Sequence, residues 1–180
     1  MSDPVIQPRC VGLYPLASAK SRILILGSMP SVASLEASHY YAHPSNRFWS
    51  LMALLFPDQQ LRWLASDYAS RVEALHQCGI ALWDTIGSCI RTGSDDASIR
   101  DAVPNNVSGF LASHPNIGLV LLNGKKSADM WTRYLAEDAL RVRPLLRVRA
   151  VPSTSAANAV FTLGTLKSSW AAALEGYRLR

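Results

Sequence analysis

The feature that most constrains the fold is a pair of short, almost uninterrupted apolar runs, one early and one late in the chain. Residues 23–26 read Ile-Leu-Ile-Leu and are followed by Gly27, and residues 117–122 read Ile-Gly-Leu-Val-Leu-Leu and are followed by Asn-Gly. Runs of this length without alternating polar residues are typical of strands that are buried on both faces of a sheet. Such strands need helices on both sides of the sheet to cover them.

Segments with helical spacing lie between these runs and after them. We expect helices over residues 48–56, 61–76, 105–113, 124–138 and 167–177, and further strands over residues 80–83 and 145–151. Because strands and helices alternate, the predicted fold class is α/β, a three-layer α/β/α sandwich with a central, mainly parallel, four-stranded sheet. Residues 92–106 are the most polar stretch and are expected to form a surface excursion.

The length and composition agree with a globular α/β protein. At 180 residues the chain suits one domain, so we expect a single domain over residues 1–180. Hydrophobic residues make up 49% and charged residues 17%, which excludes an intrinsically disordered chain. The sequence contains no run of about 18 apolar residues, the length that a transmembrane helix needs. Residues 1–10 lack the apolar segment of a secretory signal. We expect a soluble, cytoplasmic protein with no membrane contact.

Sequence signals for a metal or cofactor are weak. The three cysteines (Cys10, Cys78 and Cys89) are too few and too scattered for a disulfide framework or a paired-cysteine metal site. His39 and His43 are four residues apart, but their segment is bounded by proline and has no carboxylate close by. No GxxxxGKS, GxxxxGKT or GxGxxG phosphate turn follows the first strand. We therefore expect no cofactor.

Positive charge is concentrated at the C-terminal end of the chain. Residues 1–124 hold 8 basic and 9 acidic side chains, whereas residues 125–180 hold 10 basic and 4 acidic, a net +6. Such an excess favours a polyanionic partner such as a nucleic acid. A basic surface kept for solubility explains it equally well. The carboxylates of Asp84, Asp95 and Asp96 are expected to be solvated loop charges rather than an acid/base pair.

Three loops form the candidate site, because parallel α/β sheets bind ligands at the carboxyl ends of their strands. They are residues 27–46, 123–126 and 152–158. The first begins with Gly-Ser-Met-Pro-Ser, whose glycine and proline set a backbone that can turn amide groups toward an anion. It ends with two tyrosines, a histidine and an asparagine directly before an expected helix, a grouping that core packing alone does not explain.

Four segments, in order, resemble the uracil-DNA glycosylase superfamily. They are Gly-Ser-Met-Pro-Ser at 27–31, Tyr-Tyr-Ala-His-Pro-Ser-Asn-Arg-Phe-Trp at 40–49, Asn-Gly-Lys-Lys-Ser-Ala at 123–128 and Val-Pro-Ser-Thr-Ser-Ala-Ala-Asn-Ala at 151–159. The residues of these segments are most similar to those of the branch called hypoxanthine-DNA (deoxyinosine) glycosylases. The mismatch-specific uracil/thymine branch, which shares the His-Pro-x-Asn-Arg-Phe-Trp segment, is the next nearest. The resemblance spans residues 12 to about 177.

The resemblance implies a monofunctional DNA glycosylase without a cofactor. Such an enzyme hydrolyses the N-glycosidic bond of a deaminated base in DNA during base excision repair, and we expect it to act as a monomer. It must extrude the nucleotide, stack the base and hold the flanking phosphates. Hypoxanthine is the expected base and uracil a weaker substrate. Adenine should be refused, because its exocyclic amine puts a donor where hypoxanthine has an acceptor.

Aromatic residues are the candidates for base binding. Tyr41 matches the base-stacking aromatic of the mismatch branch, and ordinary packing at the base of the loop is its alternative role. Phe48 is a second candidate, although Phe48 and Trp49 also suit a helix face in the core. His43 is a candidate for a charge-assisted hydrogen bond to the base, and a buried structural histidine is the alternative.

The catalytic candidates lie in the first two segments. Cleavage builds positive charge on the sugar and negative charge on the base, so the protein must place a water and supply fixed donors. Superfamily members often have Asn or Asp for the water where this chain has Met29, whose side chain we expect to offer an apolar wall instead. The resemblance implies that the hypoxanthine branch relies on Asn46, and a helix cap is its alternative role. Main-chain amides of Ser28 and Met29, or Asn123, would then stabilise the base.

Small and basic residues are the candidates for DNA contacts. They are Gly124, Lys125, Ser153, Thr154, Ser155 and Ala156. The hydroxyl residues suit phosphate contacts and entry into the gap left by a flipped base, and a hydroxyl-stabilised turn is compatible with that role. Gly124 and Lys125 open a helix whose free amides favour an anion. A merely solvated helix end explains the lysine as well.

Three other functions stay open at this stage. The first is a mismatch-specific uracil/thymine-DNA glycosylase. The second is a catalytically idle nucleic-acid-binding module that lost its chemistry with Met29, and release of a base from a damaged oligonucleotide would separate it from an enzyme. The third, a hydrolase with Ser153 or Ser155 as nucleophile, is disfavoured because the chain lacks a GxSxG turn.

Overall fold

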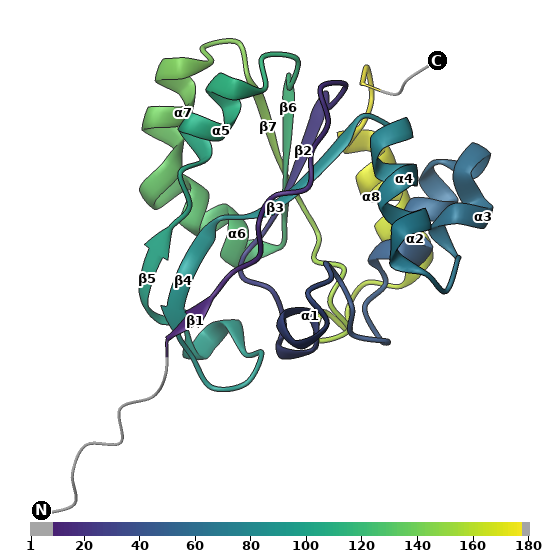
Figure 1. Cartoon of the computed structure of the whole chain (residues 1–180), viewed down its shortest axis with the longest axis horizontal. Coiled ribbons are helices and arrows are strands. Elements are labelled where there is room, and N and C mark those ends of the chain that lie inside the picture. Colours follow the sequence, from purple (N-terminus) through teal and green to yellow (C-terminus); the bar gives the residue numbers. More distant parts are fainter. Residues whose placement is uncertain (1–8, 178–180) are drawn as a thin grey trace, which may run out of the picture.

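The centre of the protein is a four-stranded parallel sheet, shown in the computed structural model, which describes residues 9–177 (Figure 1). Its strands, in spatial order, are β3 (Ile80–Asp84), β2 (Ile23–Gly27), β6 (Leu119–Asn123) and β7 (Arg147–Val151). Every residue of β2 and β6 is buried, as the two apolar runs predicted. The predicted α/β class and the mainly parallel four-stranded sheet are confirmed.

Helices cover both faces of this sheet (Figure 1). One layer contains α2 (Phe48–Leu55), α3 (Gln60–Trp63), α4 (Tyr68–Gln77) and α8 (Leu163–Ala173), and the other contains α5 (Val107–Ser113), α6 (Lys125–Met130) and α7 (Ala136–Val142). Successive side chains of β2 point to opposite faces. Accordingly, Ile23 and Ile25 pack in the core under the first layer, and Leu24 and Leu26 pack in the core under the second.

Helix boundaries differ from the sequence prediction at three places. The expected helix over residues 61–76 is interrupted, because α4 starts anew where the Asp67 side chain accepts a hydrogen bond from the Ser70 amide. Gly79 ends this region with a φ of 62°, as predicted. The helix that begins after Gly124 continues past residue 138 to Val142 through a π-helical turn. The last helix begins at Leu163 rather than 167, capped by the Thr162 hydroxyl.

A second, antiparallel sheet was not predicted. It contains β1 (Cys10–Val11), β4 (Ile86–Ile90) and β5 (Arg100–Pro104) in the order β1-β4-β5. The polar stretch 92–106 therefore holds a strand as well as loops. Its turn of 3-10 helix (Asp96–Ser98) faces a cavity at the carboxyl ends of the parallel strands. The residues of β5 are only half-buried or exposed, so the strand has little apolar pattern. This explains why β5 was not predicted from the sequence. A short helix, α1 (Val32–Ala37), completes this region.

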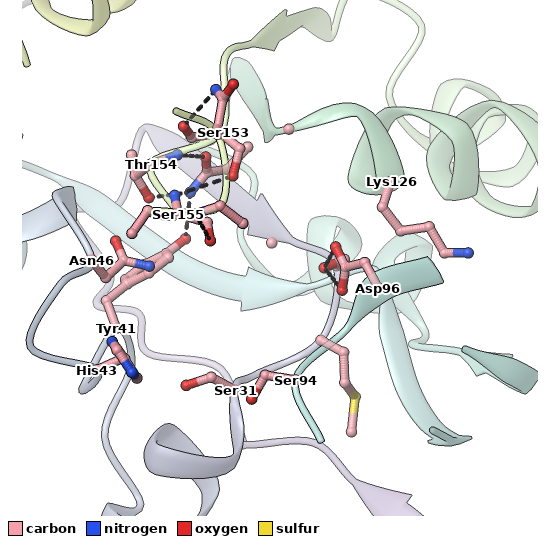
Figure 2. A pocket seen from close by; sticks show the side chains of 18 of the residues that line it. Ser31, Tyr41, His43, Asn46, Ser94, Asp96, Lys126, Ser153, Thr154 and Ser155 are labelled. Carbon is pink, nitrogen blue, oxygen red and sulfur yellow. Dashed lines mark hydrogen bonds between the residues drawn. The ribbon is translucent and has the colours of Figure 1, made fainter. Parts of the chain in front are cut away.

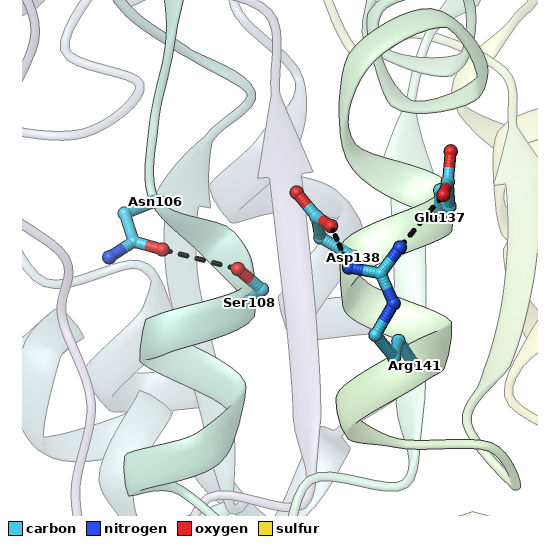
Figure 3. Close-up of polar contacts among 5 residues, drawn as sticks. All are labelled: Asn106, Ser108, Glu137, Asp138 and Arg141. Carbon is cyan, nitrogen blue, oxygen red and sulfur yellow. Dashed lines mark hydrogen bonds and ion pairs between the residues drawn. The ribbon is translucent and has the colours of Figure 1, made fainter.

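Polar side chains fix the ends and outer faces of the α5 and α7 layer (Figure 3). Asn106 accepts hydrogen bonds from the Gly109 amide and the Ser108 hydroxyl, and it thereby caps the start of α5. Arg141 on α7 binds Glu137 and Asp138. Part of the positive charge of the C-terminal third is therefore neutralised within the protein.

The described residues include no helix that is both long and apolar enough to span a bilayer. The prediction that residues 1–10 carry no secretory signal falls mainly on residues 1–8, which lie outside the described part of the chain.

Candidate active site

The three predicted loops meet at the carboxyl edge of the parallel sheet and enclose a cavity of about 1000 Å³. Residues 27–31, 40–46, 123–126 and 152–158 contribute to its lining, and the turn at 94–97 closes it from the antiparallel sheet. Figure 2 shows Tyr41, His43 and Asn46 on one side of this cavity and Asp96 and Lys126 on the other. The sequence predicted the first three walls but not the fourth.

Tyr41 is held as an aromatic wall of the cavity. Its backbone has a φ of 54°, and its ring stacks on Phe48 with centroids 3.8 Å apart and planes inclined by 14°. Phe48 is fully buried on α2 and does not line the cavity, so its predicted contact with a base is wrong. Phe48 instead supports Tyr41 from behind. The two alternatives for Tyr41 are thus combined, since it packs on the core and also lines the cavity.

Asn123 ties Tyr41 to the loop after β7. Its Nδ2 donates to the Tyr41 hydroxyl at 3.1 Å and to Thr154 Oγ1 at 3.2 Å, and its Oδ1 accepts from the Thr154 amide at 3.1 Å. These bonds occupy the amide that was predicted to bind a base, so the structure assigns Asn123 a positioning role. Thr154 is fully buried but lines the cavity, and its hydroxyl is bound by Asn123; its contact with DNA stays a prediction.

Arg47 was not recognised as a site residue, yet it holds two cavity walls together. Its guanidinium donates to four main-chain carbonyls, those of Thr154, Ser155, Asn158 and Phe161. The planar guanidinium is suited to several such bonds at once. The segment that carries Asn46 is thereby fixed to the loop after β7. The only sequence signal was its place inside the Asn-Arg-Phe-Trp segment.

Asn46 combines its two predicted roles. Its Oδ1 accepts a hydrogen bond from the Phe48 amide at 3.0 Å, at the start of α2. Its Nδ2 has no hydrogen-bond partner among the described residues, and the side chain stands beside Tyr41 at the cavity (Figure 2). The bond to Phe48 fixes the amide plane, which leaves the NH2 group available to a ligand or a water.

His43 stands at the rim of the cavity and is exposed, so the alternative of a buried structural histidine is wrong. Its Nδ1 lies 2.8 Å from the Ser45 hydroxyl and 3.3 Å from the Ser45 amide. This bond orients the ring and leaves Nε2 for other contacts.

The segment after β2 differs from its predicted role. The Met29 side chain is 7% exposed and packs with Ile86, Cys89 and Met130 in the core of the antiparallel sheet. Met29 also lines the cavity, so the apolar wall that it would offer to a base stays a prediction, while most of its side chain packs in that core. The Ser28 hydroxyl donates to both carboxylate oxygens of Asp96, at 2.9 and 2.8 Å.

Asp84 and Asp96 line the cavity away from bulk solvent, which corrects the prediction that they are solvated loop charges, whereas Asp95 is exposed as predicted. Asp84, the last residue of β3, is 4% exposed, and Asp96 faces the cavity from the 94–97 turn. Burial, followed by repulsion from Asp96, raises the pKa of Asp84 to about 7, against the opposing effects of Arg91 and Tyr40. Burial also raises the pKa of Asp96, although its bond with Ser28 opposes this. The position of Asp84 at the end of a buried strand was the available signal.

The residues predicted to contact DNA are divided between the rim and the interior. Gly124 has a φ of 98°, and a Cβ atom there would stand 2.9 Å from Ser153 Cβ, so glycine permits the two loops to approach. Lys125 pairs with Asp129 at 2.8 Å on the exposed side of α6. Ser155 is half-buried and Ala156 is exposed at the cavity rim, where a ligand can reach both.

Within residues 9–177, no three His, Cys, Asp or Glu side chains are grouped so that they could hold a metal ion.

Comparisons with known proteins agree with this arrangement. The sequence profile described as the uracil DNA glycosylase superfamily matches residues 14–174. A protein named hypoxanthine DNA glycosylase from Methanosarcina barkeri is 35% identical over 170 residues, which cover 91% of this chain and 97% of that protein. A protein of the same name from Methanosarcina acetivorans is 31% identical over 166 residues, covering 89% of this chain and 95% of that protein.

A solved structure supports the fold as well. The solution NMR structure of a candidate uracil DNA glycosylase from Methanosarcina acetivorans superposes with a TM-score of 0.74 at 27% sequence identity, and the match covers 92% of this chain and 99% of that one. The match of the profile to nearly the whole chain, the two relatives and this structure lead to one conclusion. The chain belongs to the uracil DNA glycosylase superfamily.

Proposed function

We propose that the protein is a monofunctional DNA glycosylase that hydrolyses the N-glycosidic bond of deoxyinosine and releases hypoxanthine from DNA. The observation that carries the proposal is the pairing, in one cavity, of the Tyr41 ring with the free Nδ2 of Asn46. Both relatives that bear the name hypoxanthine DNA glycosylase match this chain over nearly its full length. The enzyme would act as a cytoplasmic monomer in base excision repair.

The cavity suits an extruded nucleotide. A flipped base is held by stacking on aromatic or apolar side chains and by hydrogen bonds to its edge. The Tyr41 ring, fixed by Phe48 behind it and by Asn123 at its hydroxyl, offers such a surface at little entropic cost. A cavity of about 1000 Å³ accommodates a purine nucleoside together with water.

Asn46 is the group that places the attacking water in this proposal. As the glycosidic bond lengthens, positive charge develops on the sugar and a water must attack its anomeric carbon. The Asn46 amide plane is fixed by its bond to the Phe48 amide, so its Nδ2 and the remaining lone pair of its Oδ1 keep a constant direction. A positioned amide of this kind orients water without being consumed.

The rim of the cavity provides the contacts for the DNA backbone. Ser155 and Ala156 lie where the strand on either side of a flipped nucleotide would pass, and Lys126 borders the opposite side. Small residues allow the close approach of a phosphate, and a lysine neutralises its charge.

The test is base release from matched duplexes that carry hypoxanthine, uracil, xanthine or a mismatched thymine at one position. Single-turnover excision of hypoxanthine should be the fastest. Faster release of uracil or thymine would instead assign the protein to a pyrimidine-excising branch of the superfamily. Tight binding without release of any base would identify a binding module that has lost catalysis.

A further inference from the structure

We propose that Asp84 is the acid that gives a proton to the purine while its bond to the sugar breaks. This inference rests on the proposed function and extends it, because it assigns the leaving-group chemistry to one residue. It also explains how the site would favour a purine, whose ring nitrogens and carbonyl can accept a proton.

The position of Asp84 is the first argument. It ends β3 at the carboxyl edge of the sheet, and it is paired in register with Gly27 of β2. A Cβ atom at Gly27 would stand 2.5 Å from Asp84 Oδ1 and 3.8 Å from the Tyr41 hydroxyl. The Asp84 carboxyl group therefore lies against Gly27, which has no side chain, and near the hydroxyl end of the Tyr41 ring. It lines the same cavity as that ring.

The second argument is an unsatisfied atom. Asp84 is 4% exposed, and its Oδ2 has no hydrogen-bond partner within the described part of the chain. A buried polar atom without a partner costs roughly 1–3 kcal/mol, so such atoms are rare and point to a function or a missing ligand. A base seated on Tyr41 would bring acceptor atoms into this region of the cavity.

Burial and the charge of Asp96 favour the protonated form of Asp84 near neutral pH, and Arg91 and Tyr40 oppose it. Asp96 faces it from the 94–97 turn and repels its charged form, whereas Arg91 after β4 attracts it. The Tyr40 hydroxyl donates a hydrogen bond to the Tyr14 carbonyl, and its interaction with Asp84 lowers the pKa of that carboxyl; the hydroxyl of Tyr41 accepts a hydrogen bond from Asn123. With burial as the largest cause, the pKa of Asp84 is raised to about 7. A general acid works best when its pKa lies near the working pH.

The proposed step balances in atoms and charge. The proton on the Asp84 carboxyl moves to an acceptor atom of the purine as the bond between the base nitrogen and the anomeric carbon breaks, and the bonding electrons leave with the base. The water held by Asn46 adds its oxygen to the anomeric carbon and releases a proton to solvent. Asp84 is then carboxylate and regains its proton from solvent before the next turnover.

The experiment is a pH–rate profile for single-turnover excision of hypoxanthine from a duplex, with the wild type and with Asp84→Asn. The wild-type rate should fall about tenfold for each pH unit above about 7, because the acid form is lost. Asp84→Asn preserves size and hydrogen bonding but cannot transfer a proton. It should be slower by a factor of about 10² or more, and its rate should not fall above pH 7.

Asp96→Asn is the matched second variant. Removing the charge that repels the Asp84 carboxylate should move the falling limb of the profile to lower pH, a shift that a purely structural role of either residue would not produce. This variant also keeps the test decisive if Asp84→Asn does not fold.

The outcomes separate this inference from the proposed function. A wild-type rate that stays flat or rises through pH 7, or an Asp84→Asn rate within about threefold of wild type, overturns the acid role while hypoxanthine excision stands. No release of hypoxanthine by the wild type at any pH from 5 to 9 overturns the proposed function itself, and the acid role with it.

Discussion

The carboxyl group of Asp84 lies so close to Gly27 that no other residue fits at position 27 without displacing it. The two residues are register partners on adjacent strands, and a Cβ atom at position 27 would stand 2.5 Å from Asp84 Oδ1. The first residue of the Gly-Ser-Met-Pro-Ser segment therefore makes room for a carboxyl group that the sequence analysis predicted to be a solvated loop charge.

Gly27→Ala should consequently reduce hypoxanthine excision by about tenfold or more, because the new methyl group pushes the Asp84 carboxyl out of its place. Single-turnover rates and a thermal melt measure the effect and the folding. Gly164→Ala is the control, since a Cβ there meets only the Thr162 hydroxyl at 3.8 Å in an exposed turn of α8. Equal rates for the two variants would show that Gly27 does not serve Asp84.

Asp84 should also make stability depend on pH. Its pKa in the folded protein is about 7, above the ordinary value of 3.8, so between these values the folded state holds a proton that the unfolded state has released. The free energy of unfolding therefore falls as pH rises from about 4 to 7. Once the pH is above 7, the accumulated loss is roughly 2–4 kcal/mol. Asp84→Asn should raise the melting temperature at pH 8 and have a smaller effect at pH 4.5. A constant difference across this range would contradict the raised pKa.

Asn46 should be needed for catalysis beyond its part in starting α2. Asn46→Ala loses both the bond to the Phe48 amide and the free Nδ2, and excision should fall by a factor of about 10² or more. Asn46→Asp keeps an oxygen for the Phe48 amide and replaces the Nδ2 donor by a second, negatively charged acceptor, so α2 should begin as in wild type. If Asn46→Asp excises at the wild-type rate, the Nδ2 group has no role in catalysis.

Tyr41 should act through its ring rather than its hydroxyl. Tyr41→Phe keeps the stack on Phe48 and loses the bond to Asn123, so its excision rate should remain within about threefold of wild type. Tyr41→Ala removes the surface on which a base would stack, an interaction worth about 1–3 kcal/mol per base. Excision titrated against enzyme concentration measures both effects. Similar losses in the two variants would assign the role to the hydroxyl.

Local sequence patterns predicted the parallel sheet because they carry strong physical signals. The runs that became β2 and β6 are apolar at every position except Gly27, Gly118 and Asn123, and only a strand covered on both faces accepts such a run. The antiparallel sheet gave no such signal. Its strand β5 (Arg100–Pro104) has only half-buried and exposed residues and no continuous apolar run, and it depends on pairing with β4, which is a tertiary contact.

The candidate site was predicted where a motif carried it and missed where geometry created it. Tyr41 and Asn46 stand in a distinctive segment, and both line the cavity. Asp84 ends an ordinary buried strand, and its chemistry arises from burial and from Asp96, which approaches from 12 residues further along the chain. Phe48 was assigned to a base contact because side-chain direction is not encoded in a motif. It is fully buried and does not line the cavity.

Arg47 provides the last prediction, because one side chain connects the two segments that carry the predicted chemistry. Its guanidinium binds carbonyls of residues 154, 155, 158 and 161, none of which has another side-chain donor in the described structure. A lysine cannot serve four acceptors in one plane, so Arg47→Lys should cost roughly 2–4 kcal/mol and loosen the loop. Amide hydrogen exchange should then accelerate in residues 152–161 and much less in β2. Arg62→Lys is the control, since Arg62 is exposed and binds only the Gln59 side chain. Unchanged exchange in that loop would mean that Arg47 is not what holds it, and that the bonds of Asn123 to Thr154 hold the loop instead.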